Sequence, residues 1–113
     1  MKTSAERIQK DIETLAQFQS VPGRGCNRFS YTPAFRQAAD YLAGEMKKAG
    51  LTVRENAVGA VIGIRPGQQP KLAPIVVGSH FDSVPEGGNF DGIAGICAAL
   101  EVARVFHAEG YRP

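Results

Sequence analysis

Residues 75–92 have the sequence IVVGSHFDSVPEGGNFDG, and this stretch decides both the fold and the chemistry of the chain. Its first three residues are apolar and β-branched, which is typical of a strand buried on both faces of a parallel sheet. His80 and Asp82 follow at the carboxyl end of that predicted strand. In an extended chain, residues two apart point to the same side, so the imidazole and the carboxylate share one face while Phe81 points away.

A carboxylate beside an imidazole is a common arrangement in metal sites. A histidine that binds a metal usually donates its second ring N–H to a carboxylate, which fixes the tautomer and makes the other nitrogen more basic. After Asp82, the glycines at 87–88 allow a sharp turn, and Asp91 then opens the next predicted helix. The pattern therefore predicts half of a metal site, made of His80, Asp82 and Asp91.

Each of these residues also has an ordinary structural explanation. A single histidine in a loop is more often a polar surface residue than a metal ligand. Asp91 is well suited to the N-cap or first turn of a helix, where a carboxylate meets unpaired N–H groups. Neither explanation accounts for an imidazole and two carboxylates gathered at the end of one buried strand, and the metal-site hypothesis is favoured for that reason.

The composition is that of one ordinary globular domain. The chain has 113 residues, 43% hydrophobic and 21% charged, and a net charge of +2 without a basic run, so nucleic acid is not an expected partner. No apolar segment is long enough to span a membrane, and the N-terminal residues lack the apolar core of a signal peptide. Cys26 and Cys97 are far apart and are expected to be reduced thiols, with Cys97 buried in a helix. A cytoplasmic protein is therefore expected.

Two amphipathic helices are expected in the first half of the chain. Thr3 and Glu6 match a capping box, and apolar residues then recur at helical spacing up to residue 16. Thr32 is expected to cap a second helix with Pro33 at its first position, and Gly50 to end it.

The segment between these helices, residues 24–31, has no periodic pattern and is expected to be a loop. It contains Arg28, which is a candidate for binding a substrate anion. The simpler interpretation is a solvated or locally paired arginine.

Three strands and a third helix are expected in the second half. Residues 51–55 and 58–64 predict an antiparallel hairpin, with the 75–77 strand beside it. The third helix begins at 91–92, ends near Gly110, and carries apolar residues around its whole circumference. A helix of that kind belongs inside a larger protein, so the sequence is expected to be cut short.

Residues 78–92 resemble the metal-binding segment of the M20 family of metallohydrolases, most of all its hydantoinase/carbamoylase branch. The short step from Asp82 to Asp91, on a Gly-Gly-x-Phe-Asp-Gly loop, is the mark of that branch. The similarity continues back through Tyr31-Thr32-Pro33 and the second helix. The resemblance implies a partial three-layer α/β metallohydrolase catalytic domain, with helices packed on a mixed sheet. Residues 1–113 would be the N-terminal part of this domain. The rest of the catalytic domain and the lid domain would be absent.

The resemblance also implies a role for each site residue. His80 would bind one metal, Asp91 would bridge two, and Asp82 would be the catalytic carboxylate that orients His80. The complete enzyme would use two divalent ions, zinc, manganese, cobalt or nickel, and 113 residues alone would bind metal weakly or not at all. The implied reaction is hydrolysis of C–N amide bonds in N-carbamoyl amino acids, allantoate or related ureido compounds, for which these residues alone would be inactive.

Other functions are consistent with parts of the sequence. One is an M20 metallopeptidase of the aminopeptidase or dipeptidase type. Another is a non-catalytic chain that self-associates into a homo-oligomer, with a dimer as the simplest form. A phosphate or nucleotide site is disfavoured, because the glycines match neither G-x-G-x-x-G nor the P-loop and Asp91 would put a negative charge where phosphate binds.

Overall fold

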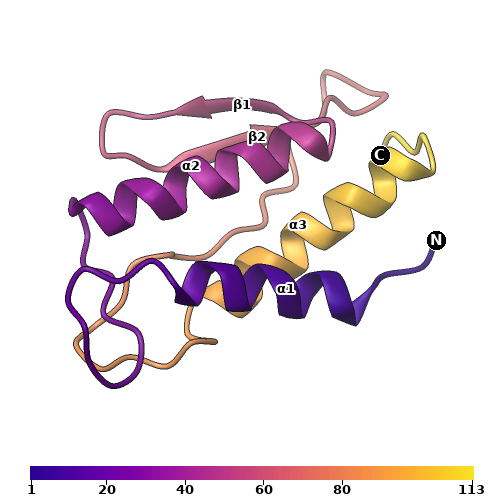
Figure 1. The fold of residues 1–113 in the computed structure, drawn as a ribbon. Coiled ribbons are helices and arrows are strands. Elements are labelled where there is room, and N and C mark those ends of the chain that lie inside the picture. Colours follow the sequence, from indigo (N-terminus) through magenta and orange to yellow (C-terminus); the bar gives the residue numbers. More distant parts are fainter.

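The computed structural model describes residues 1–113 and has three helices and one β-hairpin (Figure 1). The elements are helices α1 (Ala5–Ala16), α2 (Pro33–Lys48) and α3 (Ile93–Ala108), and strands β1 (Thr52–Glu55) and β2 (Val61–Ile64). Helix α2 packs against both strands and also contacts α3, while α1 packs against α3. The chain is thus an α/β protein, as the sequence predicted. No helix has the length and apolar character needed to cross a membrane.

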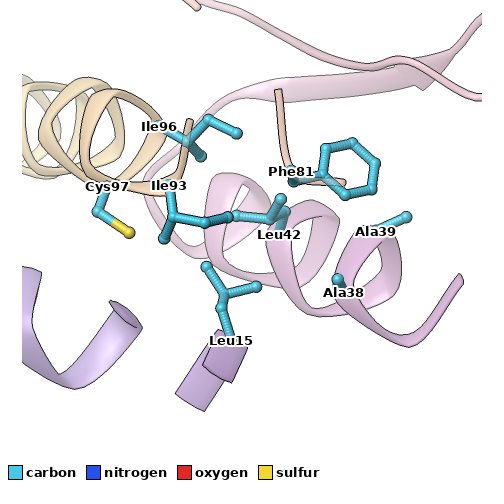
Figure 2. Close-up of a cluster of buried hydrophobic side chains, with 8 residues drawn as sticks. All are labelled: Leu15, Ala38, Ala39, Leu42, Phe81, Ile93, Ile96 and Cys97. Carbon is cyan, nitrogen blue, oxygen red and sulfur yellow. The ribbon is translucent and has the colours of Figure 1, made fainter. Parts of the chain in front are cut away.

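The core lies where the three helices meet (Figure 2). Its buried side chains come from all three helices and from one loop residue: Leu15, Ala38, Ala39, Leu42, Phe81, Ile93, Ile96 and Cys97. The side chains of Leu42 and Ile93 point toward each other at the centre. Phe81 is the loop residue, and it stands between His80 and Asp82 in the sequence. The stretch that carries the predicted site is therefore anchored in the core.

Local sequence signals predicted the ends of α2 correctly. The Thr32 hydroxyl accepts the backbone N–H of Phe35 as the N-cap, and Pro33 is the first helical residue. Gly50 follows the helix with φ of +75°, a left-handed conformation that glycine adopts without strain. Gly110 has a similar φ just beyond α3, as expected.

The start of α1 differs from the prediction. The N-cap is Ser4 rather than Thr3, and its hydroxyl accepts the backbone N–H of Arg7. The carboxylate that binds the Ser4 N–H, at 2.7 Å, belongs to Glu101 of α3 and not to Glu6. The predicted capping box is therefore wrong, because a tertiary contact replaces the local one.

The hairpin is confirmed, with β1 and β2 paired antiparallel. The second strand begins at Val61, later than predicted, because the Asn56 side chain accepts the N–H groups of Val58 and Ala60 and holds residues 56–60 in a turn.

The predicted strand at residues 75–77 is wrong. These residues have no regular secondary structure, and Ile75, Val76 and Val77 are 89%, 84% and 70% exposed. The sheet contains only β1 and β2, so the expected mixed sheet is not formed either. A β-branched run favours a strand, but the stability of a strand comes from neighbours on both sides, and none lies beside this segment.

Helix α3 is not apolar on every side, because it carries a buried polar face. Arg104 donates to Asp11 of α1 at 2.5 Å and to Glu45 of α2 at 2.6 Å. Glu101 is fully buried and accepts hydrogen bonds from Arg7 of α1, which hold the pKa of this carboxyl below its ordinary value. A network of charges therefore joins the three helices beside the apolar core.

Replacing Arg104 with methionine is expected to lower the free energy of unfolding by about 3 kcal/mol, because Asp11 would keep a buried charge without its partner. Urea unfolding followed by circular dichroism measures this loss. Arg36→Met is the matched control: Arg36 forms its ion pairs at the exposed surface, where such pairs contribute less than about 1 kcal/mol. Equal losses in the two variants would contradict a stabilising role for the buried network.

Candidate metal site

The structure brings the three predicted site residues together. His80 Nε2 lies 3.7 Å from Asp91 Oδ2, and His80 Nδ1 lies 3.3 Å from Asp82 Oδ1. The imidazole thus stands between two carboxylates, one facing each ring nitrogen. All three side chains are partly exposed, at 50% for His80, 40% for Asp82 and 64% for Asp91. The site is open to solvent.

The donor atoms of His80 and Asp91 fit a shared divalent ion. Imidazole nitrogen and carboxylate oxygen bind zinc at about 2.0–2.2 Å, so two such ligands of one tetrahedral ion lie about 3.4 Å apart. The observed separation of 3.7 Å is close to that value. The structure holds no group of three or more His, Cys, Asp or Glu residues that could bind a metal together. His80 and Asp91 thus offer two donor groups, fewer than the three or four protein ligands of a usual zinc site.

Phe81 sets the direction of the two residues beside it. Its ring is buried and stacks on Phe35 of α2, with centroids 4.4 Å apart and an interplanar angle of 17°. Since neighbouring side chains of the segment point to opposite sides, His80 and Asp82 face solvent. The sequence predicted this alternation.

Arg28 has a structural role that the sequence did not predict. Its side chain is 1% exposed, and it donates to three backbone carbonyls, those of Phe81 at 2.6 Å, Leu15 at 2.5 Å and Phe18 at 3.3 Å. Burial lowers the pKa of the guanidinium. Because every one of these acceptors belongs to the protein backbone, Arg28 is neither solvated nor placed to bind a substrate anion.

The loop containing Arg28 also pairs with the loop of the site. Arg28 and Ser83 exchange two hydrogen bonds, at 2.8 and 2.9 Å, and Cys26 and Gly87 form an isolated antiparallel bridge. A further contact reaches the site itself, since the Ser30 hydroxyl donates to Asp82 at 2.6 Å. The sequence offered no signal for these contacts, because 52 residues separate Ser30 from Asp82.

Gly92 allows the close approach of His80 to the start of α3. Gly92 is the N-cap of α3 with φ of +69°, so Asp91 does not cap the helix. A Cβ atom on Gly92 would lie 2.3 Å from the backbone oxygen of His80. Only glycine satisfies both the left-handed φ and this contact.

A protein-family model matches the second half of the chain. The model of peptidase family M28 matches residues 60–113, which include the three site residues. The sequence had indicated the M20 family, to which this family is related.

The chain is also similar to curated amidohydrolases and to solved amidase structures. It is 52% identical to an N-carbamoyl-L-amino-acid amidohydrolase of Paenarthrobacter aurescens over 97% of this chain and 26% of that protein. It is 35% identical to a ureidoglycolate hydrolase of Arabidopsis thaliana, over 100% of this chain and 24% of that protein. A hydantoinase/carbamoylase family amidase from Burkholderia ambifaria superimposes with a TM-score of 0.88 and 35% identity, over 96% of this chain and 27% of that one.

The chain belongs to the hydantoinase/carbamoylase family, as residues 78–92 had indicated. It spans about a quarter of the length of the curated relatives that it matches.

Replacing Gly92 with alanine is expected to displace His80 and to lower the free energy of unfolding by about 1–3 kcal/mol, because the backbone is left-handed and the new methyl group meets the His80 carbonyl. Chemical shifts of the His80 ring and urea unfolding measure the two effects. Gly88→Ala is the matched control in the same loop, since a Cβ there has no atom within 4 Å. An unmoved His80 ring in Gly92→Ala would show that the close approach is not required.

Proposed function

We propose that residues 1–113 form the N-terminal part of the metal-binding catalytic domain of an amidohydrolase. Its substrates are N-carbamoyl amino acids, allantoate or related ureido compounds, in which it cleaves a C–N amide bond. The observation that carries this proposal is the 3.7 Å separation of His80 Nε2 and Asp91 Oδ2, with Asp82 on the other side of the imidazole. The similarity to amidohydrolases over nearly the whole chain supports it.

His80 and Asp91 would hold the metal, and their donor set suits zinc, manganese, cobalt or nickel. In the complete enzyme we expect two divalent ions, with Asp91 bridging them. Divalent ions supply Lewis-acid polarisation of an amide carbonyl group and make water more acidic.

Asp82 keeps the imidazole in its working orientation. Its carboxylate and its backbone carbonyl both lie near His80 Nδ1, at 3.3 Å and 3.1 Å. Two acceptors at one ring nitrogen favour a proton there, which leaves the lone pair of Nε2 directed to the side of Asp91. Asp82 thus prepares the ligand, and Asp91 adds the negative charge that a cation requires.

A metallopeptidase of the aminopeptidase or dipeptidase type is the second candidate. The observation that favours it is the match of the peptidase family M28 model to residues 60–113. Both reactions break an amide bond with the same metal chemistry, so a half-site made of His80 and Asp91 serves either one. Assays on both substrate classes distinguish the two candidates.

A chimera tests the proposed function. The chain replaces the matching segment of the Paenarthrobacter amidohydrolase, and the product is assayed on N-carbamoyl amino acids, allantoate, ureidoglycolate and dipeptides. We expect hydrolysis of an N-carbamoyl or ureido substrate. Asp82→Asn is expected to lower the rate about 10- to 100-fold, because the carboxylate acts through the ligand, and Asp91→Asn to lower it further.

Asp40→Asn is the control for these variants, since Asp40 is exposed on α2 and pairs only with Arg36. A folded chimera in which Asp91→Asn is as active as Asp40→Asn would contradict the assigned ligand. Hydrolysis of dipeptides alone would favour the second candidate. The 113 residues by themselves are expected to show no turnover, because zinc sites normally use three or four protein ligands.

The exposed apolar residues point to a homo-oligomer. Ile75, Val76 and Val77 are exposed together, and Val102 on α3 is 44% exposed. Such a segment, with unpaired backbone groups, is a template for pairing with a second chain. We propose that the 113-residue chain forms a dimer through residues 75–77.

Sedimentation at micromolar concentrations is expected to show dimers of the chain that dissociate on dilution. Val76→Lys is expected to shift the chain to monomers, because it places a charge in the paired segment. Val58→Lys, in the exposed turn before β2, is the matched control and is expected to change nothing. A monomer at every concentration would contradict this prediction.

We also propose a cytoplasmic location. Cys26 and Cys97 are both free and buried, in agreement with the reduced thiols that the sequence predicted. Burial raises the pKa of the Cys97 thiol to about 12, so this thiol is not reactive. Unpaired, unreactive cysteines are typical of proteins from a reducing compartment.

A further inference from the structure

The Ser30 hydroxyl forms one end of a chain of polar contacts that ends at the imidazole. Ser30 donates to Asp82 Oδ2 at 2.6 Å. The other oxygen of this carboxylate, Oδ1, lies 3.3 Å from His80 Nδ1. The carboxylate is thus held on one side by a hydroxyl and faces the imidazole with the other.

The position of Ser30 is set by contacts at the start of α2. The backbone N–H of Phe29 donates to the Ser20 hydroxyl at 2.8 Å, and the Thr32 hydroxyl donates to the Phe29 carbonyl at 2.7 Å. Thr32 is also the N-cap of α2. Ser30 therefore lies in a short segment that is fixed on both sides, and its hydroxyl reaches Asp82 from a rigid base.

Two oxygens of Asp82 lie near His80 Nδ1, the backbone carbonyl oxygen and Oδ1 of the carboxylate. They differ in how far they can move, and the more mobile carboxylate needs a partner such as Ser30. The backbone carbonyl, 3.1 Å from Nδ1, is fixed by the chain. The carboxylate can rotate about its side-chain bonds and is 40% exposed, so water competes for it. A charge-assisted hydrogen bond from Ser30 opposes that rotation.

We propose that Ser30 is a positioning residue that orients Asp82, so that neutral His80 carries its proton on Nδ1 and leaves Nε2 free beside Asp91. The part that concerns the imidazole stands on the contacts of this chain alone. The consequence for metal binding rests on the proposed function.

The tautomer of His80 tests the proposal directly. The metal-free 113-residue chain is labelled with 15N-histidine and studied by NMR in the alkaline range where the ring-nitrogen shifts no longer change with pH. The shifts of the two ring nitrogens show which one carries the proton. We expect Ser30→Ala to reduce the ratio of the Nδ1–H to the Nε2–H form about threefold, since the carbonyl of Asp82 remains as an acceptor. Ser30→Thr, which keeps the hydroxyl, is expected to preserve the ratio.

Two controls separate positioning from a general structural effect. Ser79→Ala removes a neighbouring exposed hydroxyl that makes no hydrogen bond, and the ratio is expected to stay unchanged. His107, the other histidine of the chain, is an internal reference whose tautomer should be the same in all variants. If Ser30→Ala does not fold, Ser30→Cys replaces it, because a thiol has similar size and is a weaker donor. A ratio equal to that of the wild-type chain in the folded variant overturns the proposal.

Calorimetry with zinc on the Paenarthrobacter chimera, which completes the metal shell, is the second measurement. Ser30→Ala is expected to weaken zinc binding about three- to tenfold, somewhat less than the loss that is typical when a direct hydrogen-bond partner of a ligand is removed. Ser30→Thr is expected to leave zinc binding unchanged. If the folded chimera binds no zinc but the tautomer ratio of the chain still depends on Ser30, the proposed function fails and the positioning role stands. If zinc binds and neither measurement responds to Ser30→Ala, the positioning role fails alone.

Discussion

Arg28 carries its positive charge inside the protein, and the placement of the site depends on how that charge is satisfied. No carboxylate pairs with it; three backbone carbonyls accept its hydrogen bonds instead. Two of them, from Leu15 and Phe18, lie at the carboxyl end of α1, where the helix dipole is negative. The third belongs to Phe81. Because a buried guanidinium that loses its acceptors is very costly, α1 and the loop of the site are held together.

The stretch that carries the three candidate site residues is consequently positioned by the N-terminal part of the chain. Phe81 is fixed through its carbonyl by Arg28 and through its ring by Phe35, and Asp82 is reached by Ser30. These three contacts come from one segment, which runs from the loop after α1 into the first turns of α2. The polar network around Arg104 then fixes α3, whose N-cap lies beside Asp91, relative to α1 and α2. Two independent sets of contacts thus bring the imidazole of His80 and the carboxylate of Asp91 together.

The sequence predicted those features that depend on near neighbours in the chain. Thr32 and Gly50 mark the ends of α2 through the chemistry of their own backbone, so a short stretch was sufficient. The grouping of the site residues followed from alternation and a short loop. The contacts of Arg28 with Phe81 and of Ser30 with Asp82 each span more than fifty residues and left no local pattern. The strand at 75–77 was mispredicted because composition shows a preference for pairing and not the presence of a partner.

The site and the unpaired segment are adjacent in sequence but depend on different forces. Residues 75–77 end just before His80, yet no contact of the Arg28 loop reaches them, and their exposure shows that the core does not hold them. The fixed part of the stretch begins at Phe81. A partner that pairs with residues 75–77 would therefore order the chain up to His80, whereas the orientation of Asp82 would still be set by Ser30. Self-association and the tautomer of His80 can for this reason be changed separately. A substitution such as Val76→Lys weakens self-association without removing any contact that orients His80.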